Sequence, residues 1–132
     1  MDDIRALNDT LIGSIEGSGI ISVDQADIDM ALAFGGELQV VYATGLTPDV
    51  AARAVIAMLH ARRPLHSAPA LAACCVHIRM PLAAGIDHVD QVVATLESSH
   101  PVVVSDQTLV VLSAQQEARS DVLVRLVTIQ GE

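Results

Sequence analysis

The sequence predicts a single α/β domain over residues 1–132, in which helices pack against a mixed four-stranded sheet. The length of 132 residues suits one domain, because single domains cluster at about 100 to 150 residues. Apolar residues make up 52% of the chain and charged residues 17%, a balance that excludes disorder and provides for a buried core. Segments with apolar residues at helical spacing alternate with short β-rich runs, which predicts the element order ααβαβαββ.

Two helices are expected before the first strand. Apolar residues recur at helical spacing over residues 2–15 and again over residues 24–34. Ser22 is followed three positions later by Gln25, the spacing of a capping box, in which each side chain satisfies an unpaired backbone N–H of the other residue. The pair Gly35-Gly36 is expected to end the second helix, because glycine is common just past a helix C-terminus.

The middle of the chain predicts a strand followed by a third helix. The β-rich run at residues 38–43 is closed by Gly45. Thr47 is the expected N-cap of the next helix and Pro48 its first residue, where the missing N–H of proline has no cost. The apolar stripe of this helix is predicted to contain Ala51, Ala54, Val55, Met58 and Leu59.

A second strand is expected over residues 72–80, stopped by Pro81, and a fourth helix over residues 86–96, with the clearest apolar stripe of the chain. The remainder holds β-rich runs at residues 102–104, 108–112 and 122–129. Residues 113–121 are mostly polar. A polar connector between two β-branched runs predicts that the last two strands form an antiparallel hairpin.

The charge balance argues against nucleic acid and anionic membranes as partners. Sixteen acidic and seven basic residues give a net charge of −9, which repels phosphate groups over most of the surface. No apolar run approaches the roughly 20 residues that cross a bilayer. The first residues are acidic where a secretory leader is basic. We therefore expect a cytoplasmic protein.

The cysteines and histidines point to no metal site or cofactor. Cys74 and Cys75 are adjacent in a predicted strand, where they would face opposite sides and be poorly placed for a disulfide. The five histidines have no metal-binding spacing. His77 and Arg79 share one strand face, and with Asp87 and His88 they could line a small anion pocket. The alternative is an ordinary surface strand face.

Residues 19–27 read Gly-Ile-Ile-Ser-Val-Asp-Gln-Ala-Asp. This segment resembles the synergy loop of FtsZ, whose pattern is Gly-x-x-Asn-x-Asp-x-x-Asp. Asp24 and Asp27 match both carboxylates, while Ser22 stands in place of the asparagine. The order of elements over residues 11–130 also resembles the C-terminal domain of the FtsZ/tubulin superfamily, which has a chorismate-mutase-like fold. The family's glycine-rich phosphate loop has no counterpart in this sequence, so the resemblance implies a domain that does not bind GTP by itself.

The resemblance implies a function at an interface between subunits. In this family the synergy-loop carboxylates reach the GTP site of the neighbouring subunit and position the attacking water. Asp24 and Asp27 would act in the same way in trans, with Ser22 and Gln25 in the binding surface. The partner would be FtsZ or a second copy of the chain, and the domain alone would have no enzymatic activity.

Other interpretations of the same residues stay open. Acidic side chains in the first turn of a helix stabilise the helix dipole by about 0.3 to 1 kcal/mol and need no function. The related fold also supports oligomeric modules that bind small molecules or catalyse reactions. Met1 is either a natural start or the edge of a domain excised from a longer chain, whose GTPase half would then lie upstream.

Overall fold

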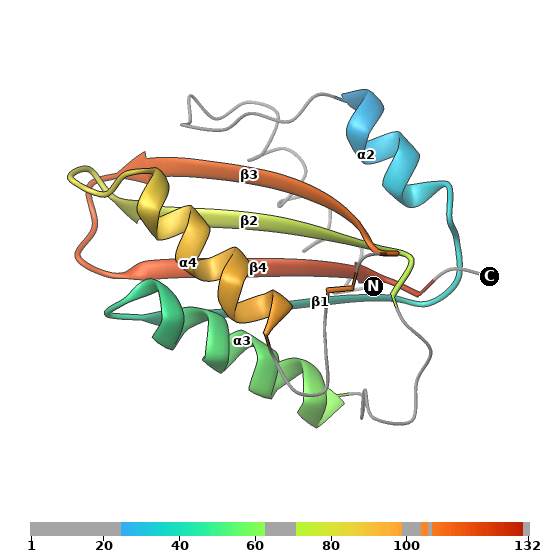
Figure 1. Ribbon diagram of the computed structural model, residues 1–132, viewed down its shortest axis with the longest axis horizontal. Coiled ribbons are helices and arrows are strands. Elements are labelled where there is room, and N and C mark those ends of the chain that lie inside the picture. Colours follow the sequence, from blue (N-terminus) through green and yellow to red (C-terminus); the bar gives the residue numbers. More distant parts are fainter. Residues whose placement is uncertain (1–24, 63–70, 99–103, 106, 131–132) are drawn as a thin grey trace.

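A computed structural model of the chain describes residues 25–62, 71–98, 104–105 and 107–130, with the backbone alone for residues 25–28 and 62. The elements follow one another as α2 (Gln25–Leu32), β1 (Leu38–Gly45), α3 (Pro48–Arg62), β2 (Ala73–Pro81), α4 (Ile86–Glu97), β3 (Leu109–Glu117) and β4 (Val122–Ile129). They form one sheet with helices on both sides (Figure 1).

The sheet is mixed and four-stranded, with the order β1-β4-β2-β3. Strand β4 pairs antiparallel with both β1 and β2, and β2 pairs parallel with β3. Strands β1, β2 and β3 therefore run in one direction and finish at the same side of the domain, with Gly45, Pro81 and Glu117. We call this side the carboxyl end. It lies at the left of Figure 1.

Helices α3 and α4 lie side by side over one face of the sheet, here called the α3/α4 face (Figure 1). The main core lies beneath them, and it is formed by Val89, Val92 and Leu96 of α4 against Val76 and Ile78 of β2, among others. A smaller core lies on the opposite face, the α2 face, under α2. Cys74 belongs to the first core and Cys75 to the second.

Local signals set the helix boundaries as the sequence predicts. The Thr47 side-chain oxygen accepts a hydrogen bond from the Val50 N–H at 3.4 Å, and the Thr47 carbonyl accepts one from the Ala51 N–H at 3.1 Å. Thr47 is thus the N-cap of α3. Gly35 and Gly36 follow α2 with positive φ of 68° and 80°, a conformation that glycine adopts without steric cost.

The apolar stripe of α3 is rotated from its predicted position. Ala51, Val55 and Leu59 are buried as expected, but Ala52 and Ile56 are buried as well, while Met58 is 37% exposed. The helix contacts α4 in addition to β1 and β4, so its buried stripe is shifted from the one that the sequence predicts.

The predicted hairpin of the last two strands is wrong. Strand β2 lies between β3 and β4, which are not neighbours. The polar residues from Ser113 onward belong to β3, which extends to Glu117. They are accommodated because Ser113 and Gln115 pair in register with His77 and Arg79 of β2 on the α2 face, while Ala114 is buried on the α3/α4 face.

The remaining elements agree with the prediction where the structure describes them. The predicted helix at residues 2–15 and the run at 102–103 lie outside the described residues. In the described part of the chain, no helix combines the length and apolar character needed to cross a membrane.

Candidate functional site

The beginning of α2 carries the end of the predicted synergy-loop motif. Gln25 is the first residue of α2 and Asp27 is the third. Their side chains, together with Ser22 and Asp24, lie outside the described residues. The role of Asp24 and Asp27 as carboxylates that act in trans therefore stays a prediction.

The second half of α2 anchors the helix to the sheet. Ala31 is fully buried in the smaller core, and Leu32 packs against the same core. Met30 and Phe34 are exposed, by 59% and 43%. The helix contacts β2 and β3, near the amino ends of these strands, because Ala73, Cys75 and Val111 belong to the same core.

Nearer the carboxyl end, the α2 face becomes polar. Here lie His77, Arg79, Ser113, Glu117 and Arg125, a set that we call the polar cluster. His77 Nδ1 and Ser113 Oγ are 2.6 Å apart, and Arg79 Nε donates to His77 Nε2 over 3.5 Å. His77 is 2% exposed and Ser113 3%. The cluster thus contains a buried imidazole that two neighbouring side chains hold in place.

These contacts define the protonation of His77. The Arg79 Nε–H can only donate, so the Nε2 of His77 accepts. The ring proton of the neutral imidazole then lies on Nδ1 and is donated to Ser113 Oγ. Burial, followed by the charges of Arg79 and Arg125, lowers the pKa of His77 to about 4, against a smaller opposing effect of Glu117. His77 is therefore neutral at pH 7.

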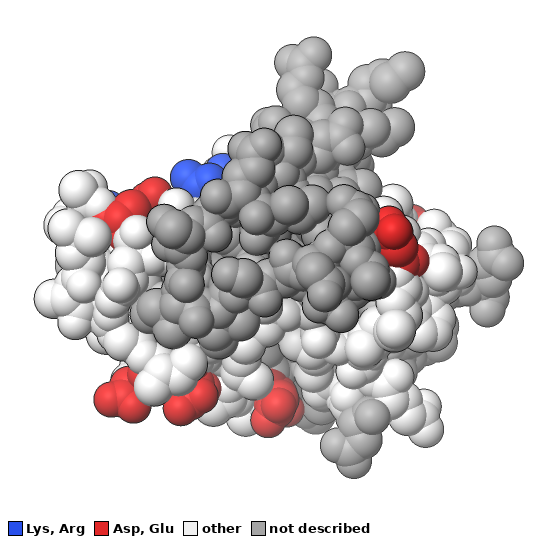
Figure 2. All heavy atoms as spheres, turned by 90° about the horizontal axis from the view of Figure 1, so that it is seen from above, with Lys and Arg blue, Asp and Glu red and all other residues white. Residues whose placement is uncertain are grey.

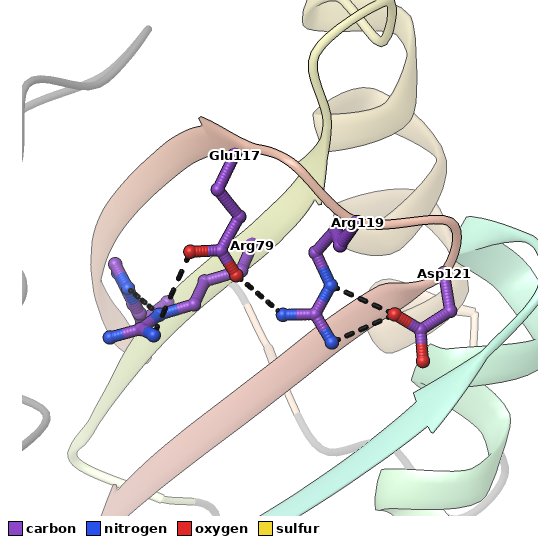
Figure 3. A network of polar contacts seen from close by, with 5 residues as sticks. Arg79, Glu117, Arg119 and Asp121 are labelled. Atoms are coloured by element: carbon purple, nitrogen blue, oxygen red, sulfur yellow. Dashed lines mark hydrogen bonds and ion pairs between the residues drawn. The ribbon is translucent and has the colours of Figure 1, made fainter.

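A chain of charged contacts continues from the polar cluster across the carboxyl end (Figure 3). Glu117 Oε2 lies 3.8 Å from Arg79 Nη1, and Glu117 Oε1 lies 2.7 Å from Arg119 Nη1. Arg119 also contacts Asp121 Oδ1 through Nε and Nη2, each at 2.8 Å. The short link at residues 118–121 crosses the end of β2 to connect β3 with β4. Arg119 contacts Glu117 at one end of this link and Asp121 at the other.

We expect Arg119→Gln to lower the free energy of unfolding by about 0.5 to 1 kcal/mol, because the network is partly solvated and such pairs are individually weak. Urea unfolding followed by far-UV circular dichroism measures the change. Arg53→Gln is the control, since it removes the same charge from an exposed position of α3. Equal losses in the two variants would show that Arg119 does not stabilise the link.

The four residues predicted to line an anion pocket are not brought together. His77 and Arg79 share the α2 face, as expected. Asp87 and His88 belong to α4, which packs on the opposite face of the sheet. They cannot join His77, because the sheet lies between them. Sequence analysis missed Ser113, Glu117 and Arg125, although Ser113, Gln115 and Glu117 alternate with buried Ala114 as a strand requires.

The cysteines are free and buried, on opposite faces as predicted. Burial raises the pKa of both thiols, that of Cys75 to about 11. Both therefore stay protonated and unreactive at pH 7. No three His, Cys, Asp or Glu side chains of the described residues lie together as a metal site would require.

No protein-family model matches this chain, and no curated protein matches it in sequence. Solved structures do. An FtsZ mutant of M. jannaschii has a TM-score of 0.76 at 18% identity, over 98% of this chain and 39% of that one. An empty FtsZ dimer of M. jannaschii has a TM-score of 0.71 at 22% identity, over 95% of this chain and 36% of that one. CetZ2 from Haloferax volcanii, solved as a GTPγS-bound protofilament, has a TM-score of 0.57 at 17% identity, over 97% of this chain and 38% of that one.

The domain therefore has an FtsZ/tubulin-like fold, the one that the motif and the order of elements predict for the C-terminal domain of this superfamily. The chain spans 39% and 36% of the length of the two FtsZ structures, which is less than two fifths of each. At these identities the likeness establishes the fold alone.

Proposed function

We propose that this domain is an FtsZ-like interaction module in cell division, cytoplasmic and without catalytic activity of its own. It docks through the beginning of α2 on the nucleotide-bearing end of an FtsZ protomer. The observation that carries the proposal is the likeness to FtsZ over 98% of the chain, with α2 beginning inside the segment that resembles the synergy loop.

The chemistry fits the residue types at this position. Phosphoryl transfer depends mainly on positioning and electrostatic stabilisation. A carboxylate that reaches a neighbour's GTP can orient the attacking water without a nucleotide bound to its own chain. Asp24 and Asp27 are three positions apart, the spacing that places two side chains on one side of a helix if the helix includes both.

Two measurements on FtsZ test the proposal with the purified domain. Light scattering reports polymer mass, and phosphate release reports hydrolysis. We expect sub-stoichiometric domain to lower polymer mass, because a docked module ends the filament, and to change the rate of hydrolysis per assembled FtsZ. Asp24→Asn/Asp27→Asn should retain the effect on polymer mass but lose the effect on hydrolysis, because asparagine keeps the shape without the charge.

The matched control is Asp90→Asn/Glu97→Gln, which removes two charges from exposed positions of α4 and should behave as the unmodified domain. An excess of domain that alters neither polymer mass nor hydrolysis rules the proposal out. If the domain also elutes as a stable oligomer, the result favours self-association, as in a small-molecule-binding or enzymatic module.

A further inference from the structure

The carboxyl end displays four large apolar side chains to solvent. Leu46 is 82% exposed and follows β1, and Val50 is 49% exposed in the first turn of α3. Leu82 is 66% exposed and follows β2, and Ile86, the first residue of α4, is 49% exposed. Leu46 and Leu82 are the most exposed large apolar side chains of the described residues. We call these four residues the apolar end patch.

The topology brings the four residues to one side. Strands β1 and β2 are parallel and both finish at the carboxyl end, so α3 and α4 both begin there. The two helices lie side by side (Figure 1). Clusters of exposed apolar side chains are uncommon on monomers and typically mark interaction sites.

Hydrogen bonds hold the two loops that carry the patch. Thr47 caps α3 through the Val50 N–H. The Ala84 N–H donates to the Pro81 carbonyl at 2.9 Å, and the Gln116 side chain donates to the Ala84 carbonyl. The leucines thus project from ordered turns, which lowers the entropic cost of binding at this surface.

The charges next to the patch favour a cationic partner. Asp49 lies in the first turn of α3 and Asp87 in the first turn of α4, and Asp90 is the fifth residue of α4. Arg53 on α3 is nearby, and Arg119 at the same end is already ion-paired with Glu117 and Asp121. In Figure 2 the red side chains along the lower edge, on the α3/α4 side, have no blue atoms beside them. The chain as a whole carries −9. A basic segment is therefore attracted and an acidic one repelled.

We propose that the apolar end patch binds a short cationic segment of another protein, which places two or three large apolar side chains on Leu46, Val50, Leu82 and Ile86. A second copy fits less well, because a stable dimer needs about 800 Å² per partner and would bring like charges together. None of the four residues belongs to α2, so this surface is separate from the one in the proposed function.

A pair of synthetic peptides tests the proposal, one amphipathic and built of Leu and Lys, the other of the same length and apolar pattern with Glu in place of Lys. Calorimetry measures their binding to the purified chain. We expect the Leu/Lys peptide to bind and the Leu/Glu peptide not to bind. Leu46→Ser/Leu82→Ser should weaken Leu/Lys binding by roughly tenfold or more, as loss of central apolar contacts does.

Met30→Ser/Phe34→Ser is the matched control, because it removes two exposed apolar side chains of the α2 region and should leave the affinity unchanged. Asp87→Lys/Asp90→Lys, which leaves the apolar residues in place, should weaken the Leu/Lys peptide and favour the Leu/Glu peptide. Equal affinity of both peptides, equal loss in the control, or a concentration-dependent dimer that Leu46→Ser/Leu82→Ser abolishes would each overturn the proposal.

Discussion

Gly45→Ala should destabilise the domain by about 2 to 3 kcal/mol, as overpacking of a close contact does. A Cβ added at Gly45 would lie 2.6 Å from the backbone nitrogen of Ala51 and 2.8 Å from Val50 Cγ1. The Ala51 nitrogen cannot move freely, because it donates to the Thr47 carbonyl in the first turn of α3, and the Ala51 side chain is fully buried. The end of β1 or the start of α3 must therefore shift.

Urea unfolding at neutral pH measures this cost, with Gly85→Ala as the matched control. A Cβ at Gly85 meets no atom within 4 Å, and its φ of −128° suits alanine. Gly85 is the N-cap of α4, so the control should change stability by only a few tenths of a kcal/mol, through a weaker cap and a less flexible unfolded chain. Equal losses in both variants would show that the contact with α3 is not the cause.

Gly45 also shows where sequence reasoning stops. Its position at the end of a β-rich run predicts the end of the strand, and β1 does end there. The approach of α3 to the Gly45 backbone depends on how the helix packs back on the sheet, and no local pattern encodes that. The same limit applies to Ala52 and Ile56, which α4 helps to bury.

Signals that act within a few residues were reliable. Thr47 and Pro48 predict the start of α3, and the apolar spacing of residues 86–96 predicts α4 within one residue. The prediction of strand pairing was wrong. The polar residues from Ser113 to Glu117 predict a loop, but they belong to a strand because polar residues of β2 lie beside them in the sheet. His77 and Arg79, which pair beside Ser113 and Gln115, are distant in sequence.

The structure tests the predicted fold but does not test the predicted motif residues. The likeness to FtsZ follows from the order of elements, which the structure confirms. The side chains of the four predicted site residues lie outside the described residues. The measurements on FtsZ described above are therefore the test of their role. The polar cluster could not be predicted as a unit, since its members come from three strands that only the sheet order brings together.

Acid should destabilise this domain through His77. Its pKa in the folded state is lowered to about 4 from the ordinary 6.5. Above pH 6.5 the imidazole is neutral in both states, so its contribution to stability is fully present. As pH falls from 6.5 towards 4, the unfolded chain takes up a proton that the folded chain does not, and the unfolded state is favoured. The loss attributable to this residue is on the order of 3 kcal/mol at most.

The difference between the unmodified chain and His77→Gln, measured by urea unfolding across this pH range, isolates the contribution of His77 from that of the carboxylates. Glutamine can still donate to Ser113, but it does not titrate, so the variant should lack the His77 part of the slope. Parallel curves would contradict the expectation.

Arg79→Met and Glu117→Gln sharpen the test, because the charges of Arg79 and Glu117 act on the pKa of His77 in opposite directions. The first should raise this pKa and shrink the loss, and the second should lower it and enlarge the loss. A histidine titration followed by NMR in the two variants would have to move in opposite directions, which a merely structural effect of either substitution would not produce.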